Sequence, residues 1–234
     1  MNNNIIECRG VVKDYKNVRA LDYLNFTVPD KGAVVGLLGT NGSGKTTLIK
    51  LLAGLLTPTS GDLRVCGMPI GTTTKSLIAY LPDSNFLCES FTVAQEVEYY
   101  KDFFEDFDEQ KALSMIQALH LPLDRKVRAL SKGNKEKLGL ILTLARNAKI
   151  YIFDEPIAGV DPAAREYIMN AILSRKKEDA TMIISTHLIA DIEPALDYVI
   201  FLKDGKAVVE GEANLLRAKE NKSIDELFRE VFRW

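Results

Sequence analysis

The segment from Gly39 to Thr47 combines glycines, a lysine and hydroxyl side chains at a spacing that suits phosphate binding. Its sequence, GTNGSGKTT, matches the pattern G-x-x-x-x-G-K-[ST] in full, between an apolar run (33–38) and a helix-forming run (48–56). The glycines let backbone N–H groups turn toward phosphates, the lysine supplies a cation and the first threonine offers a hydroxyl to Mg²⁺. We therefore expect a P-loop that binds a nucleoside triphosphate through Gly39, Asn41, Gly42, Ser43, Gly44, Lys45, Thr46 and Thr47.

Two acidic residues, Asp154 and Glu155, follow directly after an apolar run at residues 150–153. Ligands in open α/β sheets bind at the carboxyl ends of the strands. An acidic pair after a strand is common on protein surfaces, but this pair follows a P-loop along the same chain. We interpret it as a Walker B element, in which Asp154 holds Mg²⁺, directly or through water, and Glu155 accepts a proton from an attacking water.

A third segment, Leu130 to Asn134, opens a helical pattern, with Ser131 in an N-cap position. A helix N-terminus with a hydroxyl and exposed N–H groups is an anion-binding site. On its own the segment is also explained as an ordinary capped helix. Its position shortly before the acidic strand favours a role in phosphate binding.

The remaining pattern predicts one α/β domain over residues 1–234, with an antiparallel β subdomain at the start and a mostly parallel sheet at the end. A helical subdomain is expected as an insertion at roughly residues 86–146. Strands are predicted at 5–15, 20–28, 33–38, 62–66, 77–81, 150–153, 181–185 and 198–202, and helices at 48–56, 91–145, 162–176 and 188–192.

Composition limits the class of protein. The chain has 234 residues, 47% of them hydrophobic, with a net charge of −2, so no cationic excess favours a nucleic-acid partner. Its three cysteines are scattered and odd in number, which indicates free thiols in a reducing compartment such as the cytoplasm. No signal segment and no spanning apolar run is visible, so we expect contact with a membrane only through a partner.

In their order along the chain, these elements resemble those of ATP-binding subunits of the ABC superfamily. The P-loop, the Leu130–Asn134 signature segment, the Walker B acids, Gly159-Val160-Asp161 in the D-loop position and His187 in the switch position all follow the family's order. The resemblance covers nearly the whole chain and implies the P-loop NTPase fold. It also implies Mg²⁺ and ATP as cofactor and substrate.

The resemblance implies a role for each further residue. In a head-to-tail dimer, Ser131 and Gly133 of one subunit would close over the ATP at the other subunit's P-loop. His187 would contact the γ-phosphate and position Glu155, and Tyr15 would stack on adenine, unless it is a strand-end tyrosine in the core or on the surface. Asp161 would link the two sites, with a helix N-cap before Pro162 as an alternative role that is compatible with the first. The other histidine, His120, lies in an apolar helical stretch and is expected to be structural.

Two positions depart from the family pattern. Asp83 stands where most members have a glutamine, and an ionised aspartate only accepts hydrogen bonds, whereas an amide also donates. A loop acid in solvent is the alternative to a metal-sensing role. Lys132 stands where glycine is usual and Asn134 where glutamine is. We expect Lys132 to point to solvent, with a contact to the partner's nucleotide as the alternative.

The motor subunit of an ABC exporter with separate membrane subunits is the function that the resemblance implies, on the inner face of the cell membrane. Two rivals stay open: a soluble ABC-type ATPase, and a non-hydrolysing nucleotide sensor, which the retention of Glu155 and His187 disfavours. Some aromatic residues after Asp83 are expected to form the groove for a helix of the membrane subunit, although most are expected in the core: Phe91, Tyr99, Tyr100, Phe103, Phe104 and Phe107. A C-terminal apolar face is expected to pack on its own domain, with partner contact as the alternative: Ile224, Leu227, Phe228, Val231 and Phe232.

We predict that Asp83 senses Mg²⁺–ATP. A carboxylate there binds the metal more strongly than an amide but repels the γ-phosphate, so an Asp83→Ala variant should change ATP turnover or its metal dependence. The measurement is steady-state phosphate release across a Mg²⁺ titration. Unchanged turnover together with unchanged metal dependence would contradict the role.

Overall fold

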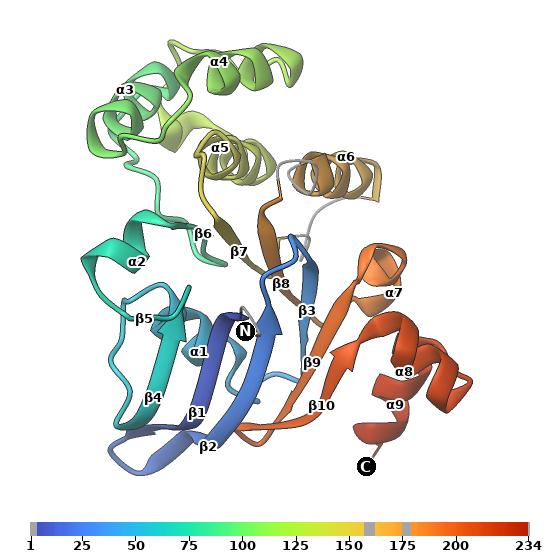
Figure 1. The fold of residues 1–234 in the computed structure, drawn as a ribbon. Coiled ribbons are helices and arrows are strands. Elements are labelled where there is room, and N and C mark those ends of the chain that lie inside the picture. The colour runs from blue at the N-terminus through green and yellow to red at the C-terminus, as the bar shows by residue number, and fades with distance from the viewer. Residues whose placement is uncertain (1–3, 157–161, 175–178, 234) are drawn as a thin grey trace.

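Two β-sheets and the helices around them make up the described part of the chain, residues 4–156, 162–174 and 179–233 of a computed structural model (Figure 1). The first sheet has four strands in the order β2-β1-β4-β5 and is antiparallel throughout. It contains β1 (Asn4–Tyr15), β2 (Val18–Pro29), β4 (Ser60–Val65) and β5 (Met68–Pro69).

The second sheet has six strands in the order β10-β9-β3-β8-β7-β6. All neighbouring strands in it are parallel except β10, which pairs antiparallel with β9 at one edge. Its strands are β3 (Val34–Leu38), β6 (Ile78–Leu81), β7 (Ile150–Asp154), β8 (Thr181–Thr186), β9 (Tyr198–Lys203) and β10 (Lys206–Glu212). The predicted α/β class with a mostly parallel sheet and an antiparallel subdomain is confirmed.

Alternate residues of the central strands face two separate cores. Val34 and Leu38 pack with helices on one side of the sheet, whereas Val35 and Leu37 pack with α1 and the antiparallel sheet on the other. Because both faces are covered, β3, β7 and β8 read as continuous apolar runs rather than as alternating ones. The helices of the core domain are α1 (Lys45–Leu52), α6 (Pro162–Ser174), α7 (Ile189–Ile192), α8 (Ala213–Glu220) and α9 (Ile224–Val231).

Between β6 and β7 the chain forms α3 (Val93–Phe103), α4 (Glu109–Ala118) and α5 (Lys132–Leu144), of which α3 and α4 lie at the top of Figure 1. The prediction of one helical stretch over 91–145 is wrong in detail. The side chain of Asp108 accepts a hydrogen bond from the Lys111 amide and so starts a new helix. His120 ends that helix in the left-handed region (φ 54°) and is exposed, so its assignment to an apolar helical stretch is also wrong.

Some elements were not predicted. The hairpin of β9 and β10 turns at Asp204 and Gly205, whose positive φ angles of 49° and 75° are typical of a type I′ turn. The dipeptide Asp-Gly is the signal that predicts such a turn. The strand β5, the helix α8 and the helix α2 (Thr72–Ser76) are short or polar and have no comparable signal.

The apolar face of α9 packs on its own domain, as expected. Ile224 and Leu227 are buried in the helix-covered core, and the ring of Phe228 lies 5.5 Å from that of Phe201 on β9, between centroids. Ser223 caps the helix and Glu226 returns the bond to it, which forms a capping box. None of the helices that the structure describes has the length and apolar character needed to cross a membrane.

The side chain of Arg146 joins the helical insertion to the edge of the parallel sheet. It is only 4% exposed, and its Nε lies 2.5 Å from Asp106 Oδ1 on the loop after α3. Its guanidinium also donates to the carbonyl oxygens of Ser76 (3.0 Å) and Ile78 (3.4 Å) and lies 3.9 Å from the ring centroid of Phe104. A planar fork of donors is needed to reach all these acceptors at once.

We predict that Arg146→Met lowers the free energy of unfolding by about 3 kcal/mol, because it leaves a carboxylate and two carbonyl groups without their donor. Urea denaturation measures this change. The matched control is Arg229→Met on α9, whose ion pair with Asp225 is 71% exposed on the arginine side and should contribute less than about 1 kcal/mol. Equal losses in the two variants would contradict the role of Arg146.

Candidate functional site

The loop between β3 and α1 is shaped by glycines at two close approaches. A Cβ atom on Gly39 would collide with the Leu202 carbonyl oxygen and Ser43 Oγ. Gly44 has φ 107°, and a Cβ there would lie 2.6 Å from the Ala20 carbonyl oxygen. Side chains are therefore excluded where the loop passes β9 and β2. Asn41, Gly42 and Thr46 are exposed and Thr47 is half-buried, so the outer side of the loop is open to a ligand.

Lys45, the first residue of α1, is 6% exposed and points back into the loop. Its Nζ donates to the carbonyl oxygens of Gly39 (2.7 Å) and Thr40 (3.1 Å) and lies 4.0 Å from Glu155 Oε1. Burial lowers the pKa of Lys45, while the negative charges of Glu155 and then Asp154 oppose that shift. An ammonium held this way is available to a phosphate that enters the loop.

Asp154 ends β7 next to Ser185 on β8, and Glu155 follows it with a left-handed φ of 51°. Ser185 Oγ donates to Asp154 Oδ1 at 2.6 Å, while Asp154 Oδ2 is buried with no hydrogen-bond partner among the described residues. Glu155 Oε2 lies 3.1 Å from His187 Nδ1. The structure thus brings together Lys45, both acids and the switch histidine, as expected from the sequence.

A hollow of about 460 Å³ lies beside these residues, lined by Thr46, Lys50, Tyr80, Asp83 and Asp154, among others. Asp83 is exposed at its rim. Burial raises the pKa of the Tyr80 hydroxyl, and the charges of Asp154 and Asp83 raise it further, so this hydroxyl stays protonated as a donor.

These residues fit a magnesium ion and a polyphosphate. The unpartnered Asp154 Oδ2 and the exposed Thr46 hydroxyl are hard oxygen ligands of the kind that Mg²⁺ prefers. Ser43 Oγ is likewise buried in the loop without a partner among the described residues, and a phosphate oxygen would accept its hydrogen bond.

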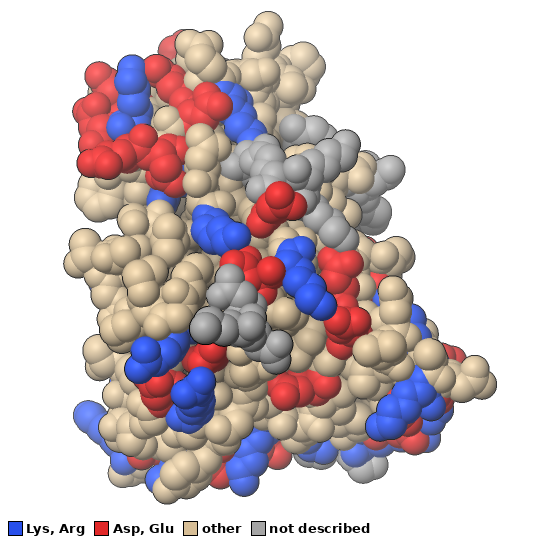
Figure 2. All heavy atoms as spheres, in the orientation of Figure 1, with Lys and Arg blue, Asp and Glu red and all other residues tan. Residues whose placement is uncertain are grey.

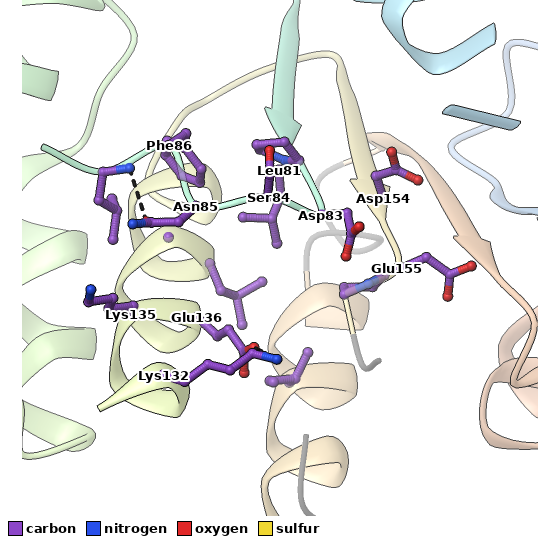
Figure 3. Close-up of a pocket in the computed structure, with 16 residues that line it drawn as sticks. Leu81, Asp83, Ser84, Asn85, Phe86, Lys132, Lys135, Glu136, Asp154 and Glu155 are labelled. Carbon is purple, nitrogen blue, oxygen red and sulfur yellow. Dashed lines mark hydrogen bonds and ion pairs between the residues drawn. The ribbon is translucent and has the colours of Figure 1, made fainter. Parts of the chain in front are cut away.

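A second hollow, of about 150 Å³, separates Asp83 and Glu155 from the start of α5 (Figure 3). Lys132 and Glu136 line it from the α5 side, and their side chains lie 3.8 Å apart between Nζ and Oε1. The Lys132 side chain is 83% exposed, in agreement with the expectation that it points to solvent. Ser131 caps α5 by accepting from the Asn134 amide at 3.3 Å, and of the residues described, neither it nor Gly133 lines either hollow.

Two further predicted residues have different outcomes. Tyr15 ends β1 with 42% exposure, and Lys13 Nζ lies 5.3 Å from its ring centroid, so it is a surface residue and not a core one. Asp161 lies outside the described residues, with the rest of the D-loop segment.

Ser185 is a site residue that sequence reasoning missed. It belongs to β8, which is buried over its whole length, and it sits one strand away from the acids. The available signal was a serine near the carboxyl end of an otherwise apolar run, two residues before His187. The same reasoning that identified Asp154 applies to this position.

Comparison with known proteins gives consistent matches. A family model described as ABC transporter matches residues 21–158. The SkfA peptide export ATP-binding protein SkfE of Bacillus subtilis is 29% identical over 86% of this chain and 87% of its own. The Nod factor export ATP-binding protein I of Burkholderia lata is 30% identical over 92% of this chain and 73% of its own. A solved ATP-binding subunit of an ABC transporter superposes with a TM-score of 0.88 at 27% identity, covering 98% of this chain and all of that one.

Proposed function

Because the chain belongs to the ABC transporter family and is similar to export ATP-binding proteins, we propose that it is the ATP-hydrolysing motor of an exporter with separate membrane subunits. In this proposal Mg²⁺–ATP binds at the interface of a head-to-tail homodimer. Binding closes the dimer, hydrolysis opens it, and a membrane partner converts the motion into transport.

The observation that carries the proposal is the position of Glu155. Its carboxylate lies between a buried ammonium, Lys45 Nζ at 4.0 Å, and His187 Nδ1 at 3.1 Å. A carboxylate held at hydrogen-bond distance by a histidine is oriented to accept a proton from a water. This contact favours hydrolysis over the sensor alternative, because a sensor needs no oriented base.

The roles proposed for the other residues are those of the matching motif positions in the family. Asp154, Thr46 and Asp83 are proposed to hold Mg²⁺, which when bound would neutralise charge that develops on the phosphates. Tyr15 is proposed to carry the adenine ring on its exposed face. The loop residues Gly39, Asn41, Gly42, Ser43, Gly44, Lys45 and Thr47 are proposed to hold the phosphates.

The dimer proposal rests on the exposed N-terminus of α5. Ser131 is held as an N-cap, and both it and Gly133 face solvent, which leaves the helix N-terminus open to an anion from another molecule. We assign Ser131 and Gly133 to the partner's nucleotide, and Asp161 to contact between the two sites.

The membrane subunit is proposed to dock in an aromatic groove of about 380 Å³, lined by Phe86, Cys88, Phe91, Glu96, Tyr99, Tyr100, Phe103 and Phe104. Tyr99 is 50% exposed and Phe103 65% exposed, although large aromatic side chains usually gain by burial. Figure 2 shows acidic side chains over α3 and α4. Glu98 and Asp102, next to Tyr99 and Phe103 on α3, are exposed. A segment with apolar and basic residues matches both features, and docking there would hold the protein at the cytoplasmic face of the membrane.

Replacing the proposed base gives the direct test. We predict that Glu155→Gln lowers ATP turnover by at least about 100-fold while ATP binding persists, because an amide cannot accept the proton. Phosphate release measures turnover, and size-exclusion chromatography with ATP should show trapped dimers of the variant. Equal low rates in wild type and variant, with no dimers, would favour the sensor instead.

The docking proposal predicts a membrane-bound fraction that depends on Tyr99 and Phe103. Replacing both by serine removes apolar area from the groove only, so ATP turnover of the purified protein should persist while co-sedimentation with host-cell membranes falls. Leu215→Ser on α8 is the matched control, because Leu215 has the same 65% exposure as Phe103. Equal membrane binding by all variants would contradict this docking surface.

A further inference from the structure

The hydroxyl of Ser185 contacts both acids of the site. Ser185 is fully buried on β8, opposite Asp154 in the parallel register of β7 and β8. Its Oγ donates to Asp154 Oδ1 at 2.6 Å and accepts from the Glu155 amide at 3.1 Å. The same amide lies 3.0 Å from the Ser185 carbonyl oxygen. One side chain therefore fixes the carboxylate of the first acid and the backbone of the second.

For Asp154, this contact decides which oxygen is free. Since Oδ1 accepts the serine hydrogen, the carboxylate cannot rotate without losing a short hydrogen bond in a buried place. Oδ2 is the oxygen left without a partner among the described residues, and Asp154 lines the hollow that also contains Thr46 and Asp83. Carboxylate ligands of metals are commonly oriented by such a hydrogen bond to their second oxygen.

For Glu155, the contact stabilises an uncommon backbone conformation. A non-glycine residue with φ 51° is strained and needs support from its surroundings. The amide bond to Ser185 supplies that support on one side, and the carboxylate contact to His187 holds the side chain on the other. The first contact comes from β8 and the second from His187, which directly follows this strand, so Glu155 is held at its backbone and at its side chain.

We propose that Ser185 is a positioning residue that sets the affinity of the site for Mg²⁺ by orienting Asp154. The proposal rests on the proposed function, in which Asp154 holds the metal. Ser185 touches neither nucleotide nor metal in this proposal, so its removal changes the metal requirement and leaves metal-free nucleotide binding intact. If the hydrogen bond of Ser185 were only structural, its loss would lower the stability of the fold and leave the Mg²⁺ requirement unchanged.

The test compares Ser185→Ala with Thr181→Val. Thr181 is a matched control because it is fully buried on the same strand, and its hydroxyl has no hydrogen-bond partner among the described residues. Two quantities are measured with the fluorescent nucleotide mant-ATP: its affinity in EDTA, and the Mg²⁺ concentration that gives half of the metal-dependent increase in affinity. Thermal unfolding without ligands reports on folding separately.

We expect Ser185→Ala to raise the half-saturating Mg²⁺ concentration about 10-fold, with unchanged affinity in EDTA, and Thr181→Val to change neither. Ser185→Thr, which keeps the hydroxyl, should restore a value near that of wild type. If Ser185→Ala does not fold, Ser185→Cys, with a weak donor of similar size, should show the same rise. A wild-type Mg²⁺ requirement in a folded variant without the hydroxyl, or an equal rise in Thr181→Val, would overturn the proposal. Nucleotide binding by wild type that does not respond to Mg²⁺ would instead contradict the proposed function.

Discussion

The candidate nucleotide site depends on three parallel strands that end side by side, in the order β3-β8-β7. Each strand passes directly into charged or polar residues: the P-loop after Leu38, His187 after Thr186, and Glu155 after Asp154. The resulting cluster places a lysine ammonium and two carboxylates at positions that are almost wholly or largely buried. Burial lowers the pKa of Lys45, and the nearby negative charges of Glu155 and Asp154 oppose that shift.

The two cores on either side of the sheet make this positioning rigid. The strand ends cannot shift in register without moving Val35 and Ile183 out of one core and Leu38 and Phe153 out of the other. Arg146 fixes the helical insertion against the sheet. It forms an ion pair with the loop after α3 and a hydrogen bond with the segment that leads into β6. The position of α5, with Ser131 at its start, is thereby linked to the sheet that carries the nucleotide site.

The parts of the site that could be predicted from the sequence are those whose residues are neighbours along the chain. The P-loop needs its glycines at fixed spacings, and Gly39 and Gly44 show why, since their surroundings leave no room for a side chain. Contacts between strands depend on their register. The serine at the end of an apolar run marks Ser185 as a site residue, but its partner Asp154 follows only from the pairing of β7 with β8. The helix ends within residues 91–145 were not predicted, because Asp108 and His120 set them through the backbone. Asp108 caps a helix and His120 adopts a positive φ, and neither changes the pattern of apolar residues. Asp83 lines the hollow beside Asp154. Its carboxylate attracts a metal ion and repels a phosphate, and neither sequence nor geometry tells which effect on hydrolysis is larger.

In the proposed function, Glu155 and His187 act as one unit in hydrolysis. A double-mutant cycle tests it, with phosphate release at saturating Mg²⁺–ATP measured for wild type, Glu155→Gln, His187→Ala and the double variant. Residues that act as a unit show strongly non-additive effects. We expect His187→Ala to lower turnover in the wild-type background and to add almost nothing to the effect of Glu155→Gln. Full turnover in His187→Ala, or independent losses that multiply in the double variant, would contradict it.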